Sequence, residues 1–319
     1  MSYREADLSL LRTVRRGGRR HMVDQSLLAG VPGPDRSFGG FLDSLPDLLA
    51  GRDLRTVIAA VAAAARNRRG VILLLGGHVV KVGLGPLLGE LIRRGVVTHV
   101  AMNGATAIHD WELAVCGETS EDVAAGLADG TFGMVEETGT EMNAAIDAAA
   151  ARDQGLGEGL AEALSRQPEL PGRPASLLIA CRDIGVPVTV HAAIGAETIH
   201  QHPTSDGAAL GATSHRDFRR LAGSLPDLDD GGCVLNIGSA VILPEVFLKA
   251  LTVARNLEGG RPRRFLAADF DMIRHYRPRV NVVERPTADH GTGIQLTGHH
   301  ELLIPLLAWG VLDALDSPR

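Results

Sequence analysis

The sequence has few aromatic residues, few cysteines and almost no lysine. Aromatic residues make up only 3% of the 319 residues, so the core must be built from the small and aliphatic side chains among the 45% that are hydrophobic. The three cysteines, Cys116, Cys181 and Cys233, lie far apart, which excludes a disulfide framework and a CxxC zinc motif and suits a reducing cytoplasm. Lys81 and Lys249 are the only lysines.

Long apolar runs and an excess of positive charge are also missing. No apolar run approaches the ~20 residues that a membrane span needs, and the charged start of the chain lacks the apolar segment of a signal peptide. The net charge of −6 argues against a general nucleic-acid surface. The basic run at residues 12–21 is either a solvated segment or a phosphate contact. We therefore expect a cytoplasmic protein with no nucleic-acid or membrane partner.

Short apolar runs alternate with helical patterns through most of the chain. Residues 1–50 are basic, Gly-rich and Pro-rich in turn and are predicted to form an N-terminal appendage, whereas residues 51–319 are predicted to form one domain. The alternation predicts an α/β fold with a parallel sheet and helices on both faces. The predicted strands lie at residues 70–77, 97–104, 186–195, 233–238 and 264–273, with shorter ones in NVVERP (281–286) and GIQLTG (293–298).

Three titratable residues begin the helix that follows the second predicted strand. In VTHVAMNGATAIHDWELAVCG (97–117), a strand ends at Asn103-Gly104, and His109, Asp110 and Glu112 lie in the first two helical turns. Ligands bind at the carboxyl ends of parallel strands. Partial burial of a histidine and two carboxylates costs free energy, which favours a functional reason for placing them there. We therefore predict that these three residues are catalytic. The alternative is that Asp110 caps backbone N–H groups, His109 is a surface residue and Glu112 pairs with an arginine.

Glycine-containing breaks follow several predicted strands. Glycine lets the backbone approach a phosphate, and the helix N-terminus that follows supplies free N–H groups. GGHVVKVGLG is neither a Walker A sequence nor a good GxGxxG, so a nucleotide site is predicted from the repetition alone. Lys81, close to the first break, is either a phosphate contact or a surface lysine. The breaks are Gly76-Gly77-His78, Asn103-Gly104, Gly195 and Gly238-Ser239.

A polar, histidine-rich segment spans residues 197–217 and carries His200, His202 and His215. It is predicted to be a long irregular loop, and such loops are usually functional. Its HxH spacing fits metal ligation only where carboxylates or a further histidine converge. The sequence does not show that convergence, so no metal ligands are assigned.

With these elements in order, the sequence resembles the deoxyhypusine synthase family over roughly residues 70–315. GGHVVKVG, MNGATAIHDWEL, CVLNIGSAVILPEV, FLAADFD and TGHHELLIPLL match successive cofactor turns and loops of that family. The resemblance implies a Rossmann-like, NAD-binding fold and a homotetramer with sites between subunits. It implies polar contacts with substrate or cofactor at His109 and Asp110. It also implies cofactor contacts at Gly77, His78, Lys81, Asn103, Gly104, Gly238, Ser239, Asp269, Thr297, Gly298 and His299.

The departures from that family exclude its reaction. The family forms an imine on a lysine, and the matching segment here, NVVERPTAD, contains none. The family's Lys-His-His is Ile242-Leu243-Pro244 in this chain, and its aspartate after the third strand is Gly195. Transfer of an aminobutyl group to a protein lysine is therefore not expected.

A second resemblance is shorter. NGATAIHDWE, followed by GMVEETGTEMNAAI, is similar to the C-terminal ornithine cyclodeaminase domain of cyanobacterial arginine dihydrolase proteins. This implies NAD-linked chemistry at a carbon bearing an amino group, without a lysine imine. His109 would then be the base, and Asp110 or Glu112 would anchor the substrate ammonium.

We therefore expect an NAD-dependent enzyme of amino acid or polyamine metabolism that acts on a small, ornithine-like amine or amino acid, as a lyase or a transferase. NAD and NADP are not distinguished. The alternative is a non-catalytic or regulatory nucleotide-binding protein of deoxyhypusine synthase-like fold. The titratable group at residues 109–112 and the histidine-rich segment favour the enzyme. The missing lysine and Gly195 favour the alternative.

Overall fold

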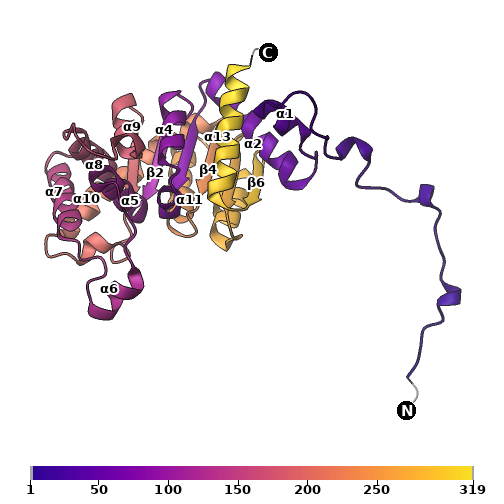
Figure 1. Ribbon diagram of the computed structural model, residues 1–319, viewed down its shortest axis with the longest axis horizontal. Coiled ribbons are helices and arrows are strands. Elements are labelled where there is room, and N and C mark those ends of the chain that lie inside the picture. Colours follow the sequence, from indigo (N-terminus) through magenta and orange to yellow (C-terminus); the bar gives the residue numbers. More distant parts are fainter. Residues whose placement is uncertain (1–2, 318–319) are drawn as a thin grey trace.

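A computed structural model describes residues 3–317, and a single parallel sheet runs through its centre (Figure 1). The strand order is β3-β2-β1-β4-β5-β6, the doubly wound order of dinucleotide-binding folds. The predicted Rossmann-like α/β class is confirmed. The strands are β1 (Val71–Leu75), β2 (His99–Asn103), β3 (Val188–His191), β4 (Cys233–Ile237), β5 (Leu266–Asp271) and β6 (Thr292–Thr297).

Helices cover both faces of the sheet, so the strands are apolar on both sides. Every residue of β1 and β4 is buried, whereas β6, an edge strand, alternates with exposed positions. The helices of eight residues or more are α2 (Leu49–Arg66), α4 (Gly85–Arg93), α5 (Gly104–Cys116), α7 (Glu136–Ala151), α8 (Leu156–Ser165), α9 (Leu177–Ile184), α10 (Gly207–Ser224), α11 (Ile242–Leu257) and α13 (His300–Asp316).

Several shorter helical turns complete the fold. The α-helical ones are α1 (Phe38–Ser44), α3 (Gly77–Lys81), α6 (Val123–Asp129) and α12 (Arg285–Thr287), and the π-helical one is η7 (Pro278–Glu284). The 3-10 turns are η1 (Leu8–Leu10), η2 (Arg16–Gly18), η3 (Gln25–Leu27), η4 (Arg173–Ala175), η5 (Thr198–Gln201) and η6 (Leu225–Leu228).

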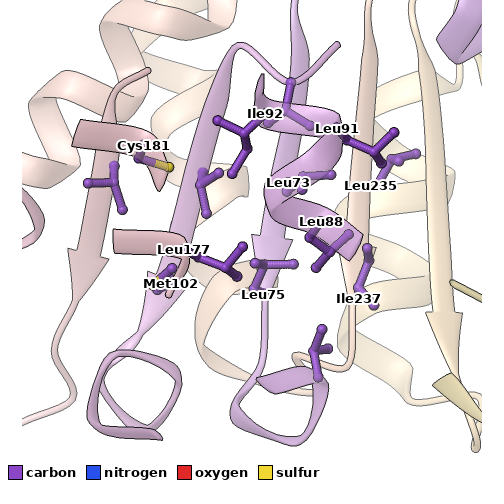
Figure 2. Close-up of a cluster of buried hydrophobic side chains, with 14 of the residues drawn as sticks. Leu73, Leu75, Leu88, Leu91, Ile92, Met102, Leu177, Cys181, Leu235 and Ile237 are labelled. Atoms are coloured by element: carbon purple, nitrogen blue, oxygen red, sulfur yellow. The ribbon is translucent and has the colours of Figure 1, made fainter. Parts of the chain in front are cut away.

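The alternation of side chains along β1 divides the interior into two cores. Leu73 and Leu75 point to the face covered by α4, α5 and α9, where Leu88, Ile92 and Leu177 pack against them (Figure 2). Ile72 and Leu74 point to the other face, where residues of α10 and α11 cover them. Cys181 and Cys233 are both fully buried in the first core, as expected of small apolar residues.

The segment that precedes α1 trails away from the body of the molecule (Figure 1). All but one of the described residues 3–37 are exposed. This N-terminal segment joins the body of the molecule at α1. There Leu42 is buried, and the ring centroids of Phe38 and Trp309 lie 6.0 Å apart. Among residues 3–317 no helix has both the length and the apolar character for crossing a membrane.

One predicted strand is helical. NVVERP, at residues 281–286, lies in η7 and α12 and not in the sheet. The reason is topological: β5 and β6 are parallel neighbours, and parallel strands need a crossover segment between them. Residues 278–287 supply that crossover, with Val282 and Val283 packed in the second core.

The strand order reverses direction between β1 and β4, where two glycines meet. The Gly76 N–H donates to the carbonyl of Ile237, and a Cβ on Gly76 would overlap the Gly238 carbonyl oxygen. Gly238 itself has a φ of +68°, a left-handed conformation that favours glycine. Ligands of doubly wound sheets bind at this switch point, outside the carboxyl ends of the strands.

Candidate active site

A pocket of about 610 Å³ opens beside this carboxyl edge. That volume is typical of small-molecule sites. Helix α5 supplies one wall through residues spaced three or four apart on a single face, and α3 supplies Lys81. The opposite wall comes from the excursion around α6, which stands out from the body next to α5 and α7 (Figure 1). The α5 residues in the wall are Ala105, Ile108, His109, Glu112 and Cys116.

His109 is held in one tautomer by a short hydrogen-bonded chain. The Thr119 hydroxyl donates to the Glu112 carboxylate at 2.5 Å, so its oxygen must accept from His109 Nδ1, which lies 2.7 Å away. The proton therefore resides on Nδ1. Among residues 3–317 no group hydrogen-bonds to Nε2 of His109. This nitrogen is not among the fully buried unpaired atoms, so it is accessible. Its lone pair is available to a ligand in the pocket.

The surroundings of His109 keep the imidazole neutral. Burial, and then the nearby positive charge of Lys81, lower the pKa of His109 to about 4. The Cδ2 edge of the ring lies 3.1 Å from the position that a Cβ on Gly77 would take. His109 thus has its free nitrogen in the pocket and its ring edge against the first glycine turn.

The pocket wall is acidic. Four glutamates line it together with Lys81: Glu112, Glu118, Glu121 and Glu197. The Glu121 carboxylate also accepts a hydrogen bond from the Gly133 N–H, which ties the α6 excursion together. With His109 neutral, carboxylates outnumber cations, so the field in the pocket favours a positively charged ligand.

Asp110 does not face this pocket, which corrects the prediction of a substrate-binding carboxylate there. It is 1% exposed, and its carboxylate accepts from Ser176 Oγ (2.6 Å), Leu177 N (2.7 Å) and Leu178 N (3.1 Å). It therefore caps the start of α9. A helix turns about 100° per residue, so residue 110 is carried off the face that residues 109 and 112 share. The alternative stated above for Asp110, that it caps backbone N–H groups, is therefore the one that the structure shows.

The other two alternatives do not describe the structure. His109 is not a surface residue, since only 18% of its side chain is exposed, and the partners of Glu112 are Thr119 and Thr138, not an arginine. Two of the three predicted residues thus lie together in the pocket.

Glu197 was missed by sequence reasoning, although it lies in the pocket wall. Its carboxylate sits on the first turn of α5, where it accepts from the Gly104 N–H, and a Cβ on Gly104 would overlap it. The same side chain accepts from Ala193 N at 3.0 Å and lies 3.0 Å from His200 Nδ1. Burial raises its pKa. Its only sequence signal is an acidic residue shortly after the third strand.

The first two glycine breaks differ in what they leave open. At β1, Gly77 and His78 begin α3 beside the switch point, and Lys81 at its end is exposed. At β2, Asn103 caps α5 by accepting from Thr106 N at 2.9 Å, and Glu197 occupies the N–H of Gly104. The second break thus already holds a carboxylate, whereas the exposed Lys81 brings a positive charge to the end of the helix that follows the first.

The remaining predicted cofactor residues lie along β4 to β6. Gly238 is part of the switch point, and Ser239 Oγ accepts from Leu243 N. Asp269 is enclosed within β5, where burial raises its pKa to about 6 and Asn236 Nδ2 donates to it at 2.8 Å. Thr297 ends β6 at the carboxyl edge, Gly298 and His299 follow it, and Thr297 and His299 are exposed.

His300, next to the predicted His299, is the buried histidine of this region. Its Nε2 donates to the Phe270 carbonyl at 3.1 Å, and its enclosed Nδ1 has no partner among residues 3–317. The ring lies 5.5 Å from that of His78. Burial, and then His300, lower the pKa of His78.

The histidine-rich segment is not one long irregular loop. It forms η5 and the first half of α10, which Asp206 caps at Ala208 N. His200 lies beside Glu197, His202 Nε2 donates to the Gly133 carbonyl, and His215 stacks on Phe218. The described part of the chain has no group of three His, Cys, Asp or Glu side chains that could hold a metal ion.

No protein-family model matches this chain, and no curated protein matches it in sequence. Solved structures do match it. A conserved putative LOR/SDH protein from Methanococcus maripaludis S2 has a TM-score of 0.52 at 14% identity, over 83% of this chain and 70% of that one. A ternary complex of AgrE, an arginine dihydrolase, with ornithine and NAD⁺ has a TM-score of 0.48 at 16% identity, over 82% of this chain and 33% of that one.

A putative deoxyhypusine synthase from Entamoeba histolytica has a TM-score of 0.49 at 10% identity, over 88% of this chain and 96% of that one. This chain thus spans about a third of AgrE, and the two resemblances expected from sequence recur among its structural neighbours. At such identities the likeness is one of fold alone.

Proposed function

We propose that the protein is an NAD-dependent enzyme acting on a small amine or amino acid. One observation carries the proposal. His109 is neutral, has Nε2 free in an acidic pocket, and lies against the Gly77 turn at the switch point of the sheet. A base, a cation-attracting pocket and a place for a dinucleotide therefore share one edge of the sheet.

The strand order and the glycines of the switch point support a dinucleotide there. A Cβ on Gly76 would overlap the Gly238 carbonyl oxygen and one on Gly77 would meet His109 Cδ2, so these glycines let β1, β4 and α5 pack closely, and Gly238 is left-handed where β4 ends. Lys81 would approach a phosphate from the end of α3. The α5 N-terminus fits less well, because Glu197 already accepts from Gly104. Gly77, Gly238 and Lys81 are thus the proposed contacts, with His78 and Ser239 beside them.

The chain's own groups would perform the proton chemistry. When bound, NAD would accept a hydride from the carbon that bears the amino group. His109 Nε2 would take the proton from the substrate nitrogen, and Thr119 and Glu112 would hold the ring in place. The free carboxylates of the wall would bind a second ammonium group of the substrate.

A covalent lysine intermediate is not part of the proposal. Lys249 is exposed on α11, where it pairs with Glu245 in the same helix. Lys81 lies in the pocket wall, but its proposed role is electrostatic. The buried crossover at residues 278–287 contains no lysine.

We expect NAD(H) to stabilise the protein against thermal unfolding. Ligand at about 100 times its dissociation constant should add about 2.7 kcal/mol to the free energy of unfolding. Lys81→Ala should raise the dissociation constant roughly tenfold, since a charge-assisted contact contributes about 1.5 kcal/mol. Lys249→Ala is the matched control and should leave binding unchanged. Failure of every dinucleotide to shift the melting temperature at millimolar concentration would refute the cofactor assignment.

The pH profile should report the unusual environment of His109. Because the pKa of His109 is lowered to about 4, we expect kcat/KM to be flat across neutral pH and to fall only in acid as the imidazole becomes protonated. Lys81→Ala should move the acid limb to higher pH, because it removes a positive charge that disfavours protonation. A limb near the ordinary histidine value in the unmodified protein would contradict this geometry.

A nucleotide-binding protein without catalysis is the second candidate, and the absence of lysine from the crossover at residues 278–287 favours it, because no side chain there could form an imine with a substrate. The two candidates are separated by extracting and identifying nucleotide from purified protein, followed by assays of amine loss and NADH absorbance with ornithine and related diamines. A bound nucleotide that no amine changes would favour the second candidate.

We also propose that the chain forms a homo-oligomer, as the tetramer implied by the first resemblance suggests. Exposed apolar residues support this, among them Leu8, Leu10, Leu11 and Val14 on the extended segment and Trp309, 59% exposed, on α13. Light scattering should give a multiple of the 33.7 kDa chain mass. A monomer at micromolar concentration would contradict the proposal.

A further inference from the structure

A second pocket, of about 270 Å³, lies at the carboxyl end of β3 between α10 and α11. This pocket shares no lining residue with the candidate active site, so the two are separate. We propose that it binds a neutral, flat heteroaromatic ring that donates an N–H to Nδ1 of His191, the chemistry of a nucleobase. The inference does not rest on the proposed function.

We assign the proton of His191 from a hydrogen-bonded chain that starts at Ser224. With the Ser224 hydroxyl donating to the Arg220 carbonyl, 3.2 Å away, its oxygen accepts from His99 Nδ1 at 2.9 Å. His99 Nε2 is then an acceptor, and the Thr189 hydroxyl donates to it at 3.0 Å. Because that hydroxyl has only one proton, its oxygen must accept from His191 Nε2, also at 3.0 Å.

With this assignment, the hydrogen-bonded chain leaves Nδ1 of His191 without a proton, so its lone pair can accept a hydrogen bond. No group within residues 3–317 hydrogen-bonds to this nitrogen, and it is not among the enclosed unpaired atoms, although the residue is only 3% exposed. Burial lowers the pKa of His191 to about 3, so the ring stays neutral at physiological pH. A single accessible acceptor in an otherwise buried side chain calls for one donor from a ligand.

The walls of the pocket select the rest of the ligand. The rings of His215 and Phe218 are nearly parallel, at 14°, with centroids 6.3 Å apart, and lie on one side. Aliphatic side chains of Ile194, Leu210 and Val246 line the remainder, and no carboxylate, lysine or arginine contributes. An uncharged aromatic ring matches these surfaces, because a charged one would lose its hydration without a partner.

The test is an NMR titration of the full chain at pH 8 with benzimidazole, a bicyclic ring that carries one N–H. We expect saturable binding with a dissociation constant on the order of 1 mM, as befits so small a ligand. The probe 1-methylbenzimidazole keeps the ring but lacks the donor. It should bind about tenfold more weakly, because His191 Nδ1 would be desolvated without a partner.

Two glycines of α10 provide matched variants that leave His191 intact. A Cβ at Gly211, which lines the pocket, or at Gly223, which does not, would meet nothing within 4 Å. Gly211→Leu should therefore fill the pocket and weaken benzimidazole binding at least about tenfold, with Gly223→Leu unchanged. Equal affinity for the two probes, an unaffected Gly211→Leu variant, or no saturable binding to the unmodified protein would each overturn the proposal.

Discussion

Replacing His109 by alanine is expected to lower kcat about 10²–10⁴-fold, the contribution typical of a positioned general base, while NAD binding persists. The reason is local. Nε2 of His109 is the free basic nitrogen on the α5 wall of the pocket, and its ring is oriented through Thr119 and Glu112. Steady-state rates with ornithine or a related diamine, together with an NAD titration of the same variant, measure the two effects separately.

Two further variants distinguish a base from a merely structural histidine. Glu112→Gln should act through the Thr119 bridge, with a smaller loss of kcat and a shifted acid limb, because Glu112 positions His109 and does not itself take the proton. Cys116 lies on the same wall of the pocket but takes no part in the hydrogen bonds that link His109, Thr119 and Glu112. Cys116→Ala should therefore keep full activity. An active preparation that keeps its rate after His109→Ala would show that this part of α5 is structural.

Replacing Asp110 by alanine is expected to lower the free energy of unfolding by about 3 kcal/mol, because three buried donors would lose their acceptor. Chemical denaturation followed by circular dichroism measures the loss. Asp122→Ala is the matched control, since Asp122 caps α6 in an exposed setting and should cost only about 1 kcal/mol. If Asp110→Ala weakened amine binding and left stability unchanged, the carboxylate would be a substrate ligand after all.

The pH dependence of stability gives an independent check on Asp110. Burial raises its pKa to about 6, above the value of about 3.9 for an unfolded aspartate. The native state therefore binds its proton more tightly than the unfolded state does. The resulting stability is present at low pH and is lost as the pH rises through 6. Asp110→Asn cannot ionise, so this loss should be absent from its stability profile.

The sequence by itself determined the layers of the fold. Apolar runs such as residues 71–75 and 233–237 are buried on both faces, as strands covered by helices on both sides are. The run NVVERP also carries buried valines but supplies a crossover. Local composition does not encode which segments become neighbours in the sheet, and the parallel pairing of β5 with β6 left no strand position between them.

Within the site, helical geometry made part of the arrangement readable. His109 and Glu112 are three residues apart and therefore share a face of α5. The direction in which that face points depends on what packs against the opposite side of α5. There Asp110 caps the start of α9, some 65 residues later in the sequence. The partners Thr119 and Glu197 also come from other segments, so no pattern around residue 109 announces them.

The sequence thus determined the α/β class with its parallel sheet, the glycine turns and the titratable residues on one face of α5. The tertiary structure alone decided that Asp110 is a cap, that Glu197 accepts from the Gly104 N–H, that His109 lies against Gly77, and that His191 joins a hydrogen-bonded chain through Thr189. The physical reason is that hydropathy and helical period are local properties of the chain. Protonation states, capping and access to a pocket are instead set by contacts between residues far apart in sequence.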